Sequence, residues 1–384
     1  MFEMAFSFDF KSLFGSLIKS KAGSVVGIDI GASSIKMVQL RLARGAPVLE
    51  TYGEIALGPY AKIPIGKAVK LQPEKITEAV QDLIREANVT AKLGSISIPF
   101  SSSLITVLTL PKVPDDQLKQ IVPIEARKYI PMAVSEVALD WFVIPKDDTV
   151  QGEFDRVTAQ DPIQAKGVEV LLVAIHNTIL RSYQTLAAAC GITSDFFEIE
   201  IFSAIRSSVA HGLAPMLYVD IGAATTKMYV VERGVVRLTH LVTMGGQQMT
   251  ETLALSLQWD FEKAERVKRE RGLLDTTALS GDENEKIKQA MLSTLTRIFS
   301  EVNRVLLSYG QRYNKNIAHV VLAGGGASLP GLRDAAKSAL SVEVEIANPF
   351  AKTEAPAFMG NVLQEIGPGF AVSVGLALRA LKRE

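Results

Sequence analysis

The sequence predicts an α/β protein built from two related lobes. The first observation is an internal repeat, since DIGASSIK begins at Asp29 and DIGAATTK begins at Asp220. The second is that each octapeptide lies between two apolar runs of strand length, as in a β-hairpin with a tight turn. The third is that strand, turn, strand, strand, helix and strand follow in the same order both times. A repeated order of this kind favours two similar lobes over one long sheet.

Length and composition fit this class. The chain has 384 residues, enough for two or three domains, and 48% of them are hydrophobic. The 41 basic residues balance the 41 acidic ones, so net charge gives no indication of a nucleic acid partner. The single cysteine, Cys190, excludes a disulfide framework and a cysteine-based zinc site.

The N-terminal segment, 1–22, is predicted to be amphipathic. Its apolar residues recur at helical spacing: Phe10, Leu13, Phe14, Leu17 and Ile18. It fits either a short helix that packs on its own domain or a helix that binds a membrane surface or a partner. It lacks the features of a secretory signal, and no apolar run in the chain reaches the length of a membrane span.

The first lobe is predicted from two separated segments, 23–102 and 191–213. Its elements are strands at 35–43 and 47–57, a helix at 73–89, the strand SISIPF, and a helix within 198–212 that leads to the second lobe. Between the segments, 103–190 is predicted to be an inserted β-α-β-β-α module. Its elements are a strand at 103–110, a helix at 115–130, the strands VALDWFVI and VEVLLVAI, and a helix closed by Gly191.

The second lobe is predicted from 214–244 and 317–384, and the residues between them, 245–316, are predicted to form a helical subdomain. Strands are expected at 226–232 and 235–243 and at HVVLAG. A helix is expected from Leu329, with Pro330 in its first turn.

The two octapeptide turns carry residues suited to an anion. A tight turn rich in Gly and hydroxyl residues directs backbone N–H groups and hydroxyl groups at one spot. Each turn taken singly also fits an ordinary hairpin, but two facing turns can hold a polyphosphate from both sides. The residues predicted to contact it are Gly31, Ala32, Ser33 and Ser34 in the first turn and Gly222, Ala223, Ala224, Thr225 and Thr226 in the second. Lys36 would add a point charge for phosphate.

Asp29 and Asp220 are predicted to end strands at the same cleft. Two carboxylates beside a polyphosphate fit a Mg²⁺ ion held between them largely through water molecules. The alternative for each aspartate is a side chain that caps its own turn.

A third glycine cluster is predicted to contact a flat ring or a ribose. VVLAGGGASLPGL is an apolar strand followed by Gly324, Gly325, Gly326 and Ala327. It fits neither the phosphate-loop motif nor the dinucleotide motif, and its alternative is a plain strand-to-helix turn.

Two further pairs complete the candidate site. Gly245 and Gly246 are predicted to begin a helix after the strand at 235–243 and to contact the bound nucleotide. Glu265 and Lys268 share one helix face and would bind ribose or adenine; their alternative is a solvated ion pair. Serine-hydrolase and zinc-protease motifs are missing from the sequence, and the four histidines are scattered.

With these motifs the chain resembles the actin-like ATPase superfamily, whose fold has two ribonuclease-H-like lobes around a nucleotide cleft. DIGASSIK, DIGAATTK and LAGGGASLPG resemble its two phosphate motifs and its adenosine motif. The resemblance implies ATP and Mg²⁺ as ligands. IEIFSAI resembles a connecting helix in which Glu200 matches a glutamate that helps hold Mg²⁺ or the attacking water, so Glu200, Asp220 and Asp29 are the implied catalytic and metal residues. FAVSVGLALRAL resembles the second connecting helix.

The inserted module narrows the resemblance to FtsA and the PilM family, and VVGIDIGASSIKMVQL and PIEARKYIP are most similar to PilM. This implies a cytoplasmic protein at the inner face of the membrane. The implied partners are the N-terminal peptide of PilN, held between the first lobe and the module, the pilus inner-membrane platform and the pilus motor ATPase.

The second phosphate motif departs from the family pattern. Ala223 and Ala224 replace glycine, and Lys227 stands where a polar or acidic residue is common. Strand alternation suggests that Lys227 points outward, with contact to phosphate as the alternative. We therefore expect at most slow ATP hydrolysis. Two other functions stay open, an FtsA-like filament protein tethered by its N-terminus and a sugar-kinase-type phosphotransferase.

Overall fold

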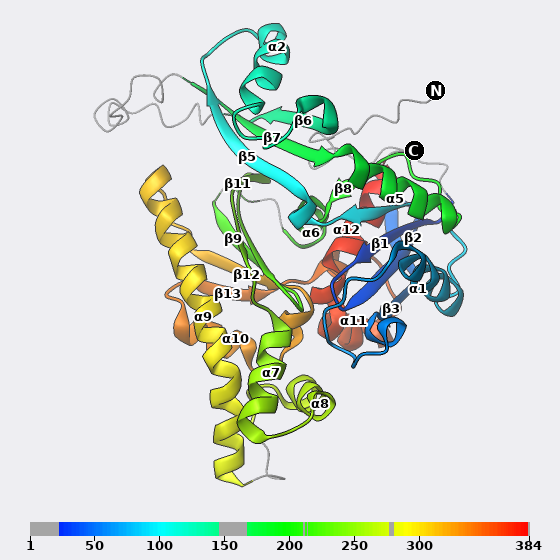
Figure 1. Cartoon of the computed structure of the whole chain (residues 1–384), viewed down its shortest axis with the longest axis vertical. Coiled ribbons are helices and arrows are strands. Elements are labelled where there is room, and N and C mark those ends of the chain that lie inside the picture. Colours follow the sequence, from blue (N-terminus) through cyan, green and yellow to red (C-terminus); the bar gives the residue numbers. More distant parts are fainter. Residues whose placement is uncertain (1–22, 146–166, 210–211, 213, 276–279, 383–384) are drawn as a thin grey trace.

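The computed structural model describes residues 23–145, 167–209, 212, 214–275 and 280–382. Two five-stranded sheets have the same strand order, and a three-stranded sheet lies beside them (Figure 1). The predicted repeat is therefore a repeat of topology as well as of sequence. The N-terminal segment, 1–22, lies outside the described residues, as does most of the loop between the last two strands of the module.

The first sheet has the order β3-β2-β1-β4-β8. Its strands are β1 (Val25–Ile30), β2 (Ser34–Ala43), β3 (Ala46–Ala56), β4 (Leu93–Ile98) and β8 (Glu198–Ile199). The first three are antiparallel neighbours, and β4 runs parallel to β1. Helix α1 (Pro73–Glu86) buries Ala79, Val80 and Leu83 and starts with a proline, which suits the first helical position.

The second sheet repeats this plan in the order β11-β10-β9-β12-β13. Its strands are β9 (Met216–Ile221), β10 (Thr226–Glu232), β11 (Val235–Val242), β12 (His319–Ala323) and β13 (Glu343–Ile346). The helices that follow the hairpin or cover the sheet are α7 (Gly246–Leu257), α8 (Phe261–Arg271), α9 (Gly281–Tyr313) and α10 (Leu332–Ala339). The predicted start of α10 was wrong, because a short 3-10 helix at Gly325–Ser328 comes first and places Pro330 ahead of the α-helix.

The inserted module has the predicted β-α-β-β-α order. Its strands are β5 (Ser103–Leu110), β6 (Val137–Val143) and β7 (Val168–His176), and its helices are α2 (Asp115–Ala126) and α5 (Asn177–Ala189). Helix α5 packs against β4 and α1 of the first lobe, while β5 lies against β11 of the second lobe. An ion pair of 2.5 Å between Arg237 Nη1 on β11 and Glu169 Oε2 on β7 also joins the second lobe to the module. The module therefore contacts both lobes.

Two helices connect the lobes through the centre of the molecule. Helix α6 (Glu200–Ser208) packs against α12 (Ala371–Lys382), and α12 also packs on β1, β2 and β4 (Figure 1). Helices α6 and α12 lie very close together at Gly375, because a Cβ atom there would lie 1.9 Å from the carbonyl oxygen of Ser203. The two helices and both sheets thus form one framework around the space between the lobes.

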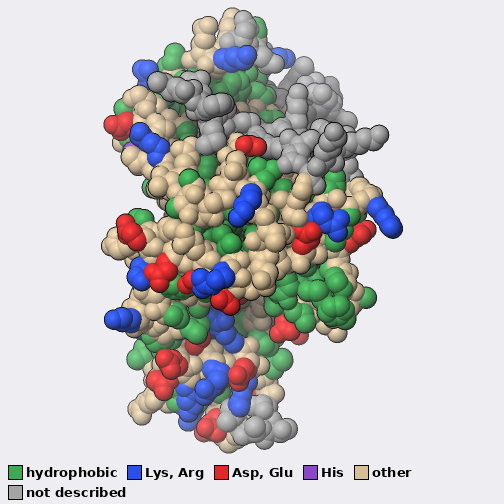
Figure 2. All heavy atoms as spheres, turned by 90° about the vertical axis from the view of Figure 1, so that its right-hand side faces the viewer, with side chains coloured by type: hydrophobic (Ala, Val, Ile, Leu, Met, Phe, Trp, Pro, Cys, Tyr) green, Lys and Arg blue, Asp and Glu red, His purple; other side chains and the backbone are tan. Residues whose placement is uncertain are grey.

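The face of the molecule shown in Figure 2 carries a mixture of positive and negative side chains. On the face shown in Figure 2, Lys and Arg side chains are interspersed with Asp and Glu side chains. None of the helices in the described part of the chain is both long enough and apolar enough to cross a membrane.

Candidate functional site

The candidate site is a cleft between the two lobes that consists of an outer and an inner cavity. Their volumes are about 270 and 120 Å³. Both cavities are lined by Ser33, Ser34, Lys36, Gly222, Ala223, Gly325 and Gly369. Apart from Gly369, which precedes α12, these shared residues come from the two octapeptides and the glycine-rich turn, so the three predicted motifs meet at one place.

The two octapeptide turns have the same backbone geometry. The Gly31 N–H donates to the Ser34 carbonyl at 3.0 Å, and the Gly222 N–H donates to the Thr225 carbonyl at 2.9 Å. The predicted residues of the first turn all line the cleft, as do those of the second apart from Thr226. The Thr226 hydroxyl is buried on the other side of its strand and donates to the Met244 carbonyl at 2.8 Å.

Lys36 points into the cleft. Its Nζ atom lies 2.8 Å from Ser34 Oγ and 2.9 Å from Glu54 Oε1, and it lines both cavities. It is therefore placed to meet an anion at the first turn. Glu54 was not predicted, although it lies directly opposite Lys36 in the pairing of β2 with β3. A search for charges opposite Lys36 in the predicted hairpin would have found it.

Three carboxylates form the floor of the inner cavity: Asp29, Glu200 and Asp220. Asp29 Oδ1 accepts a hydrogen bond of 2.7 Å from Ser97 Oγ, and burial, reinforced by the charge of Glu200, raises the pKa of Asp29 to about 6. Glu200 lies in the first turn of α6, where the helix dipole favours a negative charge. Its Oε1 atom accepts a hydrogen bond of 2.7 Å from the Phe100 N–H.

Lys227 also lies at this floor. Its Nζ atom is 2.5 Å from Glu200 Oε2 and 2.9 Å from Asp220 Oδ2. The suggested outward orientation is therefore wrong. Strand alternation places Lys227 on the same face of β10 as Tyr229 and Val231, and these two pack in the core that includes the connecting helices. That face of the sheet is its inner face.

The residues present do not fit a protein-bound Mg²⁺ ion. Two of the three candidate ligands already share the ammonium group of Lys227, and the third accepts a hydrogen bond from Ser97. Within the described ranges, no set of three or more His, Cys, Asp or Glu side chains is arranged to hold a metal ion. The predicted ligands do lie together, but a lysine occupies the place between them.

The glycine-rich turn approaches Asp220 closely. Gly324 has a φ of 80°, and a Cβ atom there would lie 2.2 Å from Asp220 Oδ1, so this position requires glycine. Gly324 lines the inner cavity, Gly326 lines the outer one and Gly325 lines both. Ala327 is buried and lines neither.

Helices α7 and α8 supply the opposite wall. Gly246 lines the outer cavity, whereas Gly245 does not and packs against the Gly222 carbonyl. The ion pair between Glu265 and Lys268, 2.6 Å long, is mostly buried, and Thr250 hydrogen-bonds to both residues. It is therefore part of the cavity wall, and the alternative of a solvated ion pair is wrong.

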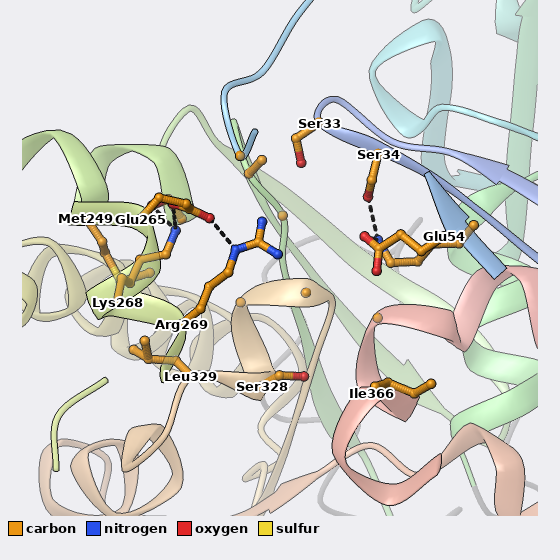
Figure 3. A pocket seen from close by; sticks show the side chains of 18 of the residues that line it. Ser33, Ser34, Glu54, Met249, Glu265, Lys268, Arg269, Ser328, Leu329 and Ile366 are labelled. Atoms are coloured by element: carbon orange, nitrogen blue, oxygen red, sulfur yellow. Dashed lines mark hydrogen bonds and ion pairs between the residues drawn. The ribbon is translucent and has the colours of Figure 1, made fainter. Parts of the chain in front are cut away.

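Figure 3 shows Arg269, Lys268 and Glu265 on one side of the outer cavity and Ser33, Ser34 and Glu54 on the other. Sequence reasoning missed several residues that line this cavity: Glu54, Gly66, Met249, Arg269, Leu329, Glu365, Ile366 and Gly369. Leu329 lies inside the glycine-rich motif, and Met249 and Arg269 lie on the two helices that carry predicted residues, whereas the others come from segments with no predicted site residue. The cleft thus combines polar turns and a lysine with apolar side chains, an arrangement that suits a ligand with an anionic end and a flat apolar end.

Comparison with known proteins agrees with this geometry. The sequence model of the type IV pilus assembly protein PilM family matches residues 27–381. The cell division protein FtsA of Enterococcus faecalis is 21% identical over 362 residues, which cover 86% of this chain and 80% of that protein.

Two solved structures share the fold. One, described as a PilM-PilN type IV pilus biogenesis complex, has a TM-score of 0.74 and 24% identity, covering 93% of this chain and 98% of that one. The other, a MamK double helical filament, has a TM-score of 0.51 and 14% identity, covering 92% and 98%. They confirm the predicted actin-like fold. Since the family match runs through both lobes and the module, the chain belongs to the type IV pilus assembly protein PilM family.

Proposed function

We propose that this protein is an ATP-binding scaffold of the type IV pilus assembly platform at the inner face of the cytoplasmic membrane. In this proposal it binds the N-terminal cytoplasmic peptide of PilN, and ATP in the cleft alters that binding. The main support for an ATP site is the pair of matched turns, Gly31–Ser34 and Gly222–Thr225. They line one cleft from opposite lobes.

The lining residues suggest how ATP lies in the cleft. The phosphates lie between the two turns, where Lys36 supplies a charge-assisted contact. The ribose and base lie on Gly325 and Gly326 in the outer cavity, whose apolar lining includes Met249, Leu329 and Ile366. The positive charges of Lys268 and Arg269 lie at the same end.

We infer slow turnover from the same geometry. In this cleft, the side chains that could orient a water molecule for attack on the terminal phosphate are carboxylates, which need a free oxygen to accept its proton. Glu200 and Asp220 are both engaged by Lys227. We therefore propose that the protein holds ATP for much longer than a working hydrolase does.

Contacts between the cleft and the module support nucleotide-sensitive peptide binding. Glu200 accepts a hydrogen bond from the N–H of Phe100, which begins the turn that leads into β5. On the other lobe, Arg237 pairs with Glu169 of the module. A change in the angle between the lobes would act on the module through both contacts, so a ligand that selects one angle also selects one module position.

PilN is proposed as the partner because a solved structure with the same fold is described as a PilM-PilN complex. The proposed groove lies between the first lobe and the module.

A filament function is the second candidate, favoured by the likeness to FtsA and to the fold of the MamK filament. Pelleting with ATP and liposomes would reveal it, and the absence of both polymer and liposome binding would remove it.

Isothermal titration of ATP tests the nucleotide site. Lys36→Ala removes a charge-assisted hydrogen bond, so we expect roughly a 10- to 100-fold weaker affinity. Lys75→Ala removes a lysine that pairs with Glu78 on the exposed face of α1, and it serves as the control with unchanged affinity. Equal affinity in the wild type and Lys36→Ala would refute the proposed position of the phosphates.

A further inference from the structure

We propose that the ammonium group of Lys227 is the resident cation of the carboxylates at the cleft floor. It takes the place of a divalent metal ion there, so that ATP binds with little dependence on Mg²⁺. The second part rests on the proposed nucleotide site, whereas the first part concerns the protein without nucleotide.

The backbone fixes Lys227 in this place. Lys227 and Asp220 lie directly opposite each other in the pairing of β10 with β9, so their side chains share one face of the sheet. Glu200 reaches the same point from the start of α6. The side chains of Lys227, Glu200 and Asp220 are only 12–14% exposed. A cation at this point therefore contacts two lobes at once, with little competition from water.

The charges favour an occupant that stays ionised. Burial alone would lower the pKa of Lys227, but the attraction of Asp220 and Glu200 raises it above its usual range. The lysine is therefore charged at neutral pH. A metal ion that binds both carboxylates has to displace the ammonium group, which then loses both of its anionic contacts inside the protein. This competition excludes the metal.

The first repeat shows that the arrangement is specific to Lys227. Lys36 lies opposite Asp29 just as Lys227 lies opposite Asp220. Its Nζ atom, however, contacts Ser34 and Glu54 at the turn instead of the carboxylates of the floor. The two equivalent lysines thus have different roles. Lys36 lies beside the proposed phosphate position, and Lys227 lies among the carboxylates.

Binding of Mn²⁺ to the nucleotide-free protein, measured by electron paramagnetic resonance, tests the first part. We expect no bound ion in the wild type and one in Lys227→Met, where Glu200 and Asp220 are released. Lys36→Met is the matched control and should bind none. A wild type that binds Mn²⁺ and loses it in Glu200→Gln would overturn the proposal, as would a folded Lys227→Met protein that binds none.

Lys227→Met leaves two buried carboxylates without their cation and is at risk of unfolding. The wild-type titration is decisive without that variant. ATP affinity of the wild type in Mg²⁺ and in EDTA tests the second part, and we expect a difference below roughly threefold. A loss above about tenfold in EDTA would overturn it. No ATP binding in either buffer would refute the proposed function, while the Mn²⁺ titration would still decide the role of Lys227.

Discussion

Lys36 and Lys227 hold equivalent positions in the two repeats but have different contacts. The sequence showed that the two lysines are equivalent, because each ends its octapeptide, but the suggested outward orientation of Lys227 was wrong. It did not predict their partners. Lys227 contacts Glu200, which comes from a different segment and reaches the cleft only through the packing of α6. A contact of this kind depends on tertiary structure and has no local signal in the sequence.

Asp29 is expected to make stability depend on pH. Its pKa is raised from 3.8 to about 6, so between these values the folded protein keeps a proton that the unfolded chain releases. The free energy of unfolding should therefore fall as the pH rises through this range. Asp29→Asn keeps an acceptor for Ser97 but removes the charge, and it should stabilise the protein by on the order of 1 kcal/mol at about pH 8.

Urea unfolding of Asp29→Asn and wild type across this pH range measures the effect. The difference in stability should shrink as the pH falls through this range and vanish below about pH 3, where Asp29 is protonated in both states. Asp334→Asn, at an exposed position of α10, is the control for loss of a carboxylate outside the cleft. A stability difference for Asp29→Asn that is the same at every pH would contradict the raised pKa.

At the scale of elements, most helices and strands were predictable because their apolar patterns have periods of two or 3.6 residues. β5, β7 and β10 agree with prediction to within one residue. The start of α10 could not be predicted in this way. The 3-10 helix at Gly325–Ser328 precedes it and depends on the contact of the glycine turn with the neighbouring strand. Nothing in the local pattern signals that contact.

Gly324 and Gly325 offer a matched test of this turn. Gly324→Ala should lower the free energy of unfolding by roughly 2–3 kcal/mol, because its φ is positive and its Cβ atom would collide with Asp220 Oδ1. Gly325→Ala has open space around its Cβ atom and should change stability by less than about 0.5 kcal/mol. It should still weaken ATP binding, because the new methyl group enters the cavity.

Chemical unfolding and ATP titration of both variants provide the measurements. If Gly324→Ala is as stable as Gly325→Ala, the close approach of the turn to Asp220 is refuted. If Gly325→Ala binds ATP as tightly as the wild type, the ligand does not lie on this turn.

The elements that join the lobes are held by a buried ion network. Glu198 on β8 contacts Arg206 on α6 at 2.6 Å and Arg379 on α12 at 2.5 Å. Although burial opposes ionisation, the two arginines lower the pKa of Glu198 to about 2. Its contribution to stability is therefore present above the ordinary pKa of glutamate and is lost only as the pH falls toward 2.

Glu198→Gln should destabilise the protein by about 3–5 kcal/mol, because two arginines stay buried without their anion. Glu78→Gln, in an exposed ion pair on α1, is the control and should cost less than about 0.5 kcal/mol. Thermal unfolding at neutral pH checks both. A small effect of Glu198→Gln would show that the network does not hold the connecting helices together.

At the scale of the whole molecule, the repeat predicted two lobes and the composition between them predicted the module. What the sequence did not reveal is that the module contacts both lobes, through α5 on one side and through Arg237 and Glu169 on the other. These residues are far apart in the chain and belong to no motif. Because the module contacts both lobes, a change in the angle between the lobes would move it.

In the proposed function, ATP in the cleft changes how the module and the first lobe bind a PilN peptide. The most direct measurement is the affinity of a fluorescent N-terminal PilN peptide, by anisotropy, with and without ATP. We expect ATP to change the wild-type affinity by about fivefold or more and to leave that of Lys36→Ala nearly unchanged. If the ATP-saturated wild type binds the peptide with the same affinity as the nucleotide-free protein, nucleotide-sensitive peptide binding is refuted.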